Sequence, residues 1–160
     1  MFSKISILIV CTANICRSPM AESLLENRLQ RTGLSESFSV DSAGTHAMGK
    51  GTRPDPRVEK VLHENNIEVK SRGSRSITQD DFEAFDHILV MDNRNYDYLM
   101  EMCPEEHKGK IRFLMDYDDS ASDKEVPDPY YGNLSGFERV YRILDQSITR
   151  FIEHINSNRY

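Results

Sequence analysis

A cysteine and an arginine near the amino terminus have the types and the spacing for phosphate chemistry. Cys11 and Arg17 are separated by five residues, and Ser18 and Pro19 follow directly in the stretch CTANICRSP. A cysteine thiolate is a strong nucleophile, and the planar guanidinium of an arginine can grip two phosphate oxygens at once. These residues therefore predict a phosphate site with a nucleophile at its floor. The alternative is a buried cysteine at a strand end and an arginine that serves another contact.

The elements on either side of this stretch would place it where it can act. Residues 3–10 are apolar or β-branched at nearly every position, which predicts a central strand covered on both faces. Residues 19–31 carry apolar side chains at helical spacing, and Pro19 suits the first position of a helix. The helix would direct free N–H groups and its positive dipole end at the loop, which favours a bound anion and the thiolate form of Cys11.

The rest of the chain alternates between predicted strands and helices. We expect further strands at residues 38–42, 87–91 and 110–114, and helices at residues 54–65, 78–85, 93–102 and 135–155. This order predicts an α/β fold of three layers, with a central four-stranded parallel sheet and helices on both of its faces. The length of 160 residues predicts one domain that spans residues 1–160.

A long irregular stretch, residues 116–132, contains a candidate proton donor. A cysteine that takes up a phosphoryl group needs an acid to protonate the leaving oxygen. Asp128 lies in the sequence DPYYG, where the proline stiffens the turn and the glycine permits it, so its carboxyl group would be held over the site. Tyr130 and Tyr131 would line an aromatic wall. A plain Asp-Pro turn with packing tyrosines is the alternative interpretation.

The cysteine count and the net charge exclude several classes of protein. Cys11, Cys16 and Cys103 are too few and too scattered for a disulfide scaffold, so a reducing cytoplasm is expected. Cys16 is either a small core residue or a thiol that traps oxidised Cys11 as a disulfide. A net charge of −6 argues against nucleic acid and anionic membranes as partners, and no apolar run approaches the about 20 residues of a membrane span. No group of potential ligands has a metal-binding spacing, so no metal and no cofactor are expected.

With these residues in place, the chain resembles the low-molecular-weight protein tyrosine phosphatase family along nearly its whole length. The resemblance rests on VCTANICRSPMAE at residues 10–22, DSAGT at 41–45, PDPR at 54–57, MD at 91–92, DPYYG at 128–132 and FERVY at 137–141. It implies a flavodoxin-like fold and a two-step, metal-free hydrolysis of a phosphomonoester. The expected partner is a phosphotyrosine protein, for which a tyrosine kinase is one candidate, and the expected state is a monomer or weak dimer.

Carried over residue by residue, the resemblance implies the roles of the reacting groups. Cys11 would be the nucleophile and Arg17 the phosphate clamp. Asp128 would be the acid that protonates the tyrosyl oxygen, and then the base that activates water. The residues expected to bind the substrate are Thr12, Ala13, Asn14, Ile15, Cys16, Ser18, Met48, Tyr130 and Tyr131.

The resemblance also implies how the loop keeps its shape. Asn14 would hold it in a strained conformation through hydrogen bonds that include Ser42, and Ser18 would donate to the sulfur of Cys11. Ala13 stands where the family usually has glycine, so a residue with a Cβ atom must accept that backbone shape.

Two further departures from the family pattern concern the opening of the site and its support. Met48 stands where many members have Trp or Tyr, so the aromatic enclosure of a phosphotyrosine ring would be weaker. Arg72 stands in place of a histidine, and it would pair with Asp92. Such an ion pair would be stronger than one with histidine and would not titrate near neutral pH.

Three other functions fit parts of the sequence. An arsenate reductase shares the cysteine loop but needs further cysteines as a relay, and only Cys103 lies outside the loop here. A protein-arginine phosphatase carries threonine at the position of Ile15, whose apolar side chain favours an aromatic ring over a guanidinium. A phosphotyrosine-binding module without turnover is disfavoured because nucleophile, clamp and acid are all present.

Overall fold

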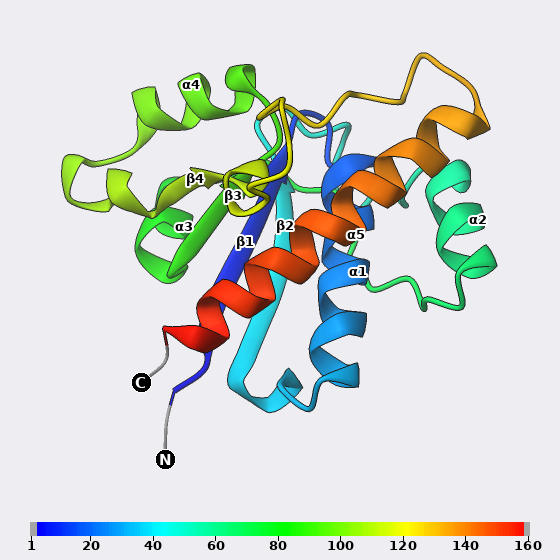
Figure 1. Ribbon diagram of the computed structural model, residues 1–160. Coiled ribbons are helices and arrows are strands. Elements are labelled where there is room, and N and C mark those ends of the chain that lie inside the picture. Colours follow the sequence, from blue (N-terminus) through cyan, green and yellow to red (C-terminus); the bar gives the residue numbers. More distant parts are fainter. Residues whose placement is uncertain (1–2, 159–160) are drawn as a thin grey trace.

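The predicted strands form one parallel sheet in the order β2-β1-β3-β4. In the computed structural model, which describes residues 3–158, they are β1 (Ile5–Cys11), β2 (Phe38–Gly44), β3 (His87–Val90) and β4 (Ile111–Phe113) (Figure 1). β1 is paired along both edges, and its residues 7–10 are fully buried. A central parallel strand is covered on both faces, which explains the unbroken apolar run in the sequence.

Helices cover both faces of the sheet, as predicted. One face carries α1 (Arg17–Arg31), α2 (Pro56–Glu64) and α5 (Leu134–Ser157), and the other carries α3 (Gln79–Ala84) and α4 (Asn93–Met102). The side chains of β1 alternate accordingly, because Ile7 and Ile9 join the core beneath α1 and α5, whereas Leu8 and Val10 join the core beneath α3 and α4. Figure 1 shows α1 and α5 packed side by side across the sheet.

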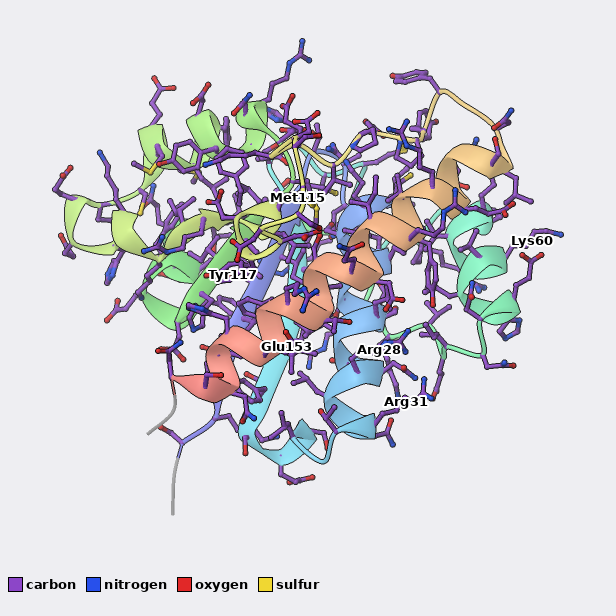
Figure 2. All side chains as sticks on the ribbon, in the orientation of Figure 1. Arg28, Arg31, Lys60, Met115, Tyr117 and Glu153 are labelled. Carbon is purple, nitrogen blue, oxygen red and sulfur yellow. The ribbon has the colours of Figure 1, made fainter. Side chains whose placement is uncertain are left out.

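α5 is a helix of 24 residues that closes one face of the core. Phe137, Ile148 and Phe151 recur at helical spacing and are fully buried. Arg28 lies on α1 beside α5 (Figure 2), and its Nε and Nη2 groups donate to Oδ1 of Asp145 on α5, at 3.1 and 2.9 Å. The two helices are therefore joined by apolar packing and by an ion pair. Within residues 3–158, no helix has both the length and the apolar character needed to cross a bilayer.

α1 and β2 differ from their predicted bounds at the ends that face the same loop. α1 begins at Arg17 rather than at Pro19, so that Pro19 takes its third position. Proline is tolerated there because the first N–H groups of a helix have no acceptor within it. β2 runs to Gly44 rather than to Ser42, because its carboxyl end stays paired with β1 as far as Cys11.

The starts of α2 and α3 are explained by their caps. The carboxylate of Asp55 accepts from the backbone N–H of Arg57 at 2.9 Å, so α2 begins at Pro56, inside the predicted range. α3 begins directly after Thr78, which forms a reciprocal capping box with Asp81.

The loops that follow β1, β2 and β3 gather at the carboxyl edge of the sheet. The irregular stretch predicted at residues 116–132 passes over this edge (Figure 1), although a short 3-10 helix, Leu114–Tyr117, takes up its first residues. The N–H of Val126 donates to the carbonyl oxygen of Met91 at 2.8 Å, which ties the long loop to the end of β3. In open parallel sheets this edge is where ligands bind.

Candidate active site

The loop between β1 and α1, residues 12–16, contains one residue in the left-handed conformation. Asn14 has a φ of 57° and is 2% exposed. Its Nδ2 group donates to Oγ of Ser18 (2.8 Å) and of Ser42 (3.0 Å), and its Oδ1 accepts from the N–H of Arg75 (3.0 Å). Asparagine tolerates this backbone shape better than most residues, and these hydrogen bonds offset the remaining strain. The hydrogen bond expected between Asn14 and Ser42 is present.

The outer side of this loop is bonded to the chain that follows β2. The N–H groups of residues 45, 46 and 48 donate to the carbonyl oxygens of residues 11, 12 and 13, at 2.9 to 3.0 Å. Gly44 comes so close that a Cβ atom there would lie 2.5 Å from the carbonyl oxygen of Thr12. Ala13 accepts its place without strain, because Asn14 and Asn66 are the only non-glycine residues within 3–158 with a positive φ. With its carbonyls bonded outward, the loop turns N–H groups inward, as anion-binding loops do.

Cys11 lies at the floor of the loop, at the end of β1. It is 2% exposed, and its Sγ lies 2.9 Å from Oγ of Ser18. Because Ser18 accepts a hydrogen bond from Asn14, its own proton is free to point at the sulfur. α1 begins above the loop and presents its positive dipole end. Both features stabilise a negative charge on the sulfur.

Arg17 reaches the same point from the first turn of α1. Its Nη1 donates to Oδ2 of Asp92 (2.7 Å) and to the carbonyl oxygen of Val126 (3.0 Å). Burial lowers the pKa of Arg17, but Cys11 and Asp92 together keep that pKa above its ordinary value. The buried Nε of Arg17 has no hydrogen-bond partner within residues 3–158. An unpaired buried donor is costly, and an oxygen of a bound oxyanion would accept from it.

The predicted ion pair between Arg72 and Asp92 is wrong. Asp92 is bonded to Arg17 instead, and Arg72 lies in another hollow beside Glu26. The chain that follows Arg72 runs along the outer edge of β2, where Ser76 forms a bridge, whereas Asp92 follows β3 on the far side of β1. The order of the strands therefore separates the two residues.

A cleft of about 120 Å³ brings most of the predicted site together. Arg17 and Asp128 face each other across it, with Nη2 of Arg17 lying 3.8 Å from Oδ2 of Asp128, whose side chain is 46% exposed. Asn14 and Ser18, which were expected to bind the substrate, do not line this cleft, and their side chains bond to each other instead. The residues that line the cleft are Cys11, Thr12, Ala13, Ile15, Cys16, Arg17, Met48, Asp128, Tyr130 and Tyr131.

Cys16 contributes to the wall of the cleft as a neutral thiol. Burial, and then the negative charges of Asp55 and Cys11, raise the pKa of the Cys16 thiol to about 12. At neutral pH it therefore stays protonated and packs as a small apolar group. Its alternative role as a trap for oxidised Cys11 stays a prediction.

Two polar residues that sequence reasoning missed complete the support of the loop. Asn95 is fully buried; its Nδ2 donates to Oγ1 of Thr12 (3.1 Å), and its Oδ1 accepts from the N–H of Met91 (3.3 Å). Glu22 is 3% exposed, and its Oε1 accepts from Oγ of Ser42 at 2.6 Å. Each lies in the first two turns of a helix that starts at the carboxyl edge of the sheet, which is the signal that could have indicated them.

Glu22 makes the stability of the fold depend on pH. Burial raises its pKa to about 8, although the hydrogen bond from Ser42 opposes this. A carboxyl group whose pKa is raised on folding contributes stability that is complete below its unfolded pKa and is lost as the pH rises through its folded pKa. When the pH rises from about 5 to about 8.5, the free energy of unfolding should fall in the wild type as Glu22 ionises. In Glu22→Gln this fall should be smaller by about 2 to 4 kcal/mol, because glutamine stays neutral.

Urea unfolding at the two pH values measures this difference. The matched control is Glu153→Gln, since Glu153 lies exposed on α5 (Figure 2) and, among residues 3–158, forms its ion pair with Arg150 at 3.2 Å. We expect the control to follow the wild type at both pH values, because exposed ion pairs contribute little. Parallel curves for the wild type and Glu22→Gln would show that Glu22 does not titrate with a raised pKa.

The fold and the cleft define an α/β protein with an anion-binding loop at the carboxyl edge of a parallel sheet. The family model for low molecular weight phosphotyrosine protein phosphatase matches residues 6–160, and the chain belongs to this family. The low molecular weight phosphotyrosine protein phosphatase of Schizosaccharomyces pombe is 38% identical over 156 residues, which cover 97% of this chain and 99% of that protein.

Solved structures confirm the predicted fold class. A protein tyrosine phosphatase from Entamoeba histolytica, solved with Hepes in its active site, matches with a TM-score of 0.93 and 39% identity over 98% of this chain and 100% of that one. The YwlE arginine phosphatase of Bacillus subtilis matches with a TM-score of 0.88 and 25% identity over 97% of this chain and 98% of that one. The same fold thus occurs in proteins named for two different activities.

Proposed function

We propose that this chain hydrolyses phosphotyrosine in proteins, and small aryl phosphates, through a phospho-cysteine intermediate. Membership of the phosphatase family supports this proposal. The observation that carries it is the single cleft in which Cys11, Arg17 and Asp128 meet, with the Nε donor of Arg17 left without a partner in residues 3–158. A nucleophile, an anion clamp and a proton donor are the groups that hydrolysis of a phosphomonoester needs.

In the first step the thiolate of Cys11 attacks phosphorus, and the bond from phosphorus to the phenolic oxygen breaks. The N–H groups of the loop and the guanidinium of Arg17 bind the remaining oxygens, on which the charge of the transition state is spread. Asp128 gives its proton to the phenolic oxygen, so the product leaves as a neutral tyrosine.

In the second step water attacks the phosphorus of the phospho-cysteine, and the bond from phosphorus to sulfur breaks. The carboxylate of Asp128 takes a proton from this water and is thereby restored to its acid form. Phosphate leaves, and the thiolate of Cys11 is regenerated under the hydrogen bond from Ser18. One ester and one water molecule give one phenol and one phosphate, with no metal or cofactor in either step.

The walls of the cleft favour a long aromatic ester. Cys11 is almost fully buried, so only a phosphate on an extended side chain can bring its phosphorus to the sulfur. Ile15, Met48 and Tyr130 offer apolar and aromatic surface, and Tyr131 stands at the rim with 91% of its surface exposed. The rings of Tyr130 and Tyr131 contact each other edge to face, at 4.9 Å between centroids. A phosphoserine is too short to span this depth.

The structure adds an argument against an arsenate reductase. Such an enzyme would pass a disulfide from Cys11 to another cysteine. Cys11 belongs to the core beneath α1 and α5, whereas Cys103 is buried in the core on the opposite face of the sheet. Cys103 therefore cannot act as the relay. An arginine phosphatase shares the fold, and the apolar Ile15 in the cleft wall is the feature that favours an aromatic substrate over it.

A panel of matched peptides tests the proposal. With identical flanking residues, we expect kcat/KM for a phosphotyrosine peptide to exceed that for a phosphoserine peptide by at least about 100-fold, and that for a phosphoarginine peptide by about tenfold. Phosphate release measures all three rates. Equal rates for phosphotyrosine and phosphoserine would contradict the depth of the cleft, and a preference for phosphoarginine would assign the other activity. Tight binding without release would identify a binding module.

The physiological setting that we propose follows from the nucleophile. A thiolate must stay reduced to act, and Cys11, Cys16 and Cys103 are all free thiols, so a reducing cytoplasm is the compartment that fits. The partner is a phosphotyrosine protein, with a tyrosine kinase as one candidate. The active unit that we propose is a monomer or weak dimer, since one chain supplies every group of the cleft.

A further inference from the structure

We infer that Arg57 is a positioning residue. It joins the acid-bearing loop, residues 128–132, to the nucleophile loop, residues 12–16, and so sets the position of the Asp128 carboxyl group relative to Cys11. Arg57 is the last residue of the PDPR sequence, and none of the catalytic steps above uses it. The inference rests on the proposed function, because it takes Asp128 as the acid. Its support comes from two sets of hydrogen bonds that meet at a single guanidinium.

The first set joins Arg57 to the acid-bearing loop. Its Nη1 donates to the carbonyl oxygen of Gly132 at 2.9 Å, and its Nη2 donates to the carbonyl oxygen of Tyr130 at 3.0 Å. These carbonyls follow Asp128 closely in the chain, and Asp128 itself accepts from the N–H of Tyr130 at 3.1 Å. The backbone that carries the carboxyl group is therefore bonded to α2 at two points.

The second set joins Arg57 to the nucleophile loop. The Nε and Nη2 groups of Arg57 donate to the two carboxylate oxygens of Asp55, at 3.0 and 2.8 Å. The backbone N–H of Asp55 donates in turn to the carbonyl oxygen of Ile15 at 2.9 Å. A continuous series of hydrogen bonds thus runs from the loop of Cys11, through Asp55 and Arg57, to the loop of Asp128.

Packing holds the guanidinium in this orientation. It lies 4.2 Å from the ring centroid of Phe137, which is fully buried at the start of α5, and 5.8 Å from that of Tyr130. Stacking on an aromatic ring together with a bidentate bond to a carboxylate uses the planar shape of arginine. A lysine at the same position would keep the charge but could not donate to Asp55 and to both carbonyls at once.

The position of Asp128 needs such a restraint. Its side chain is 46% exposed, and its closest cation, Nη2 of Arg17, lies 3.8 Å away, which is beyond hydrogen-bond length. A proton donor must come within about 3 Å of the leaving oxygen, and a displacement of about 1 Å can lower a rate about 100-fold. Loss of Arg57 should therefore impair leaving-group protonation more than nucleophilic attack.

The test compares two leaving groups in the Arg57→Met variant of the full chain. Phenyl phosphate releases a phenol that needs the acid, whereas p-nitrophenyl phosphate releases a stable anion that needs it far less. We expect kcat/KM, which reports the first chemical step, to fall about tenfold or more for phenyl phosphate and less than about threefold for p-nitrophenyl phosphate. In an Asp128→Ala background, Arg57→Met should add less than about a twofold further loss on either substrate.

Two further variants separate positioning from folding. Arg57→Lys should also lose more activity on phenyl phosphate than on p-nitrophenyl phosphate. It keeps the charge and the aliphatic part of the side chain, so it serves as the test if Arg57→Met does not fold. Arg53→Met is the matched control, since Arg53 lies just before α2, has a side chain that is 85% exposed and pairs with Glu59 at 3.1 Å. We expect the control to keep both rates within about twofold of the wild type. Thermal unfolding of each variant reports its overall stability.

The outcomes distinguish the inference from the proposed function. Equal losses on both substrates, or a loss that is repeated in full in the Asp128→Ala background, would overturn the positioning role and leave Arg57 as a support of the fold. If Asp128→Ala alone lowered both substrates equally, the role of Asp128 as acid would be wrong, and the inference would fall with it. The inference is supported if Asp128→Ala and Arg57→Met each lower kcat/KM more for phenyl phosphate than for p-nitrophenyl phosphate, and if the two losses do not add in the double variant.

Discussion

The Cys11→Ser variant is expected to lose at least about 10⁴-fold in kcat on p-nitrophenyl phosphate. A serine hydroxyl is not ionised at neutral pH, and the dipole of α1 and the hydroxyl of Ser18 are arranged to stabilise a sulfur anion, not to remove a proton from an alcohol. The substitution removes little volume from a site that is 2% exposed, so the fold and the phosphate-binding loop should persist. The expected effect is therefore on turnover and not on binding.

Steady-state kinetics and mass spectrometry of a rapidly quenched reaction measure this effect. The wild type should carry one phosphoryl group on Cys11 during turnover. Cys103→Ser is the matched control, because it makes the same chemical change on the opposite face of the sheet and should keep kcat within about twofold. Turnover that survives in Cys11→Ser, or a wild-type intermediate without phosphate on Cys11, would disprove the mechanism.

The Arg17→Lys variant is expected to lose about 10²- to 10³-fold in kcat/KM, although it keeps the positive charge. Arg17 already uses Nη1 for Asp92 and for the carbonyl oxygen of Val126, and it keeps Nε for an oxyanion. A lysine has one ammonium group and cannot serve Asp92 and the phosphate in the same geometry. The loss should appear in the transition state and in the affinity for inorganic phosphate.

Initial rates and the inhibition constant of inorganic phosphate report both effects. Arg28→Lys is the matched control on the same helix, since Arg28 bonds to Asp145 at the surface, away from the cleft. We expect its rates to stay within about twofold of the wild type. If Arg17→Lys kept the affinity for phosphate and the rate of the wild type, the bidentate role of Arg17 would be excluded.

Local pattern predicts the class of fold, because strands and helices alternate along the chain, and it predicts an element best where its apolar pattern is long. β1 and α4 are examples: the first is an unbroken apolar run and the second matches its predicted bounds, Asn93–Met102. The start of α1 is not predicted correctly, because Arg17 and Ser18 have no local pattern that marks them as helical. Ser18 is bonded to Asn14 in the folded loop, which the sequence alone does not indicate. Boundaries of this kind depend on tertiary contacts rather than on local propensity.

The candidate site divides in the same way. Residues within the first loop could be predicted, because their chemistry is concentrated in one short motif. Contacts that reach it from a distance were predicted only where the family resemblance supplied them, as for Asn14 and Ser42. The bond from Arg75 to Asn14, across 61 positions in the chain, and the choice of Arg17 as partner of Asp92, across 75, were not predicted. The wrong partner predicted for Asp92 has the same origin, since no local pattern says on which side of β1 the chain around Arg72 will run.

The contact of Gly44 with Thr12 has a consequence for protein engineering. A Cβ atom on Gly44 would lie 2.5 Å from the carbonyl oxygen of Thr12, and the N–H groups of residues 45, 46 and 48 bond the carbonyl oxygens of residues 11, 12 and 13. The shape of the nucleophile motif therefore depends on a second segment of the chain. Transplanting residues 11–18 alone into another strand-helix junction would transfer the reacting residues without the segment that fixes the conformation of the loop. We expect the loop to keep its shape only when residues 41–48, which supply Gly44 and the three N–H donors, are transplanted together with it.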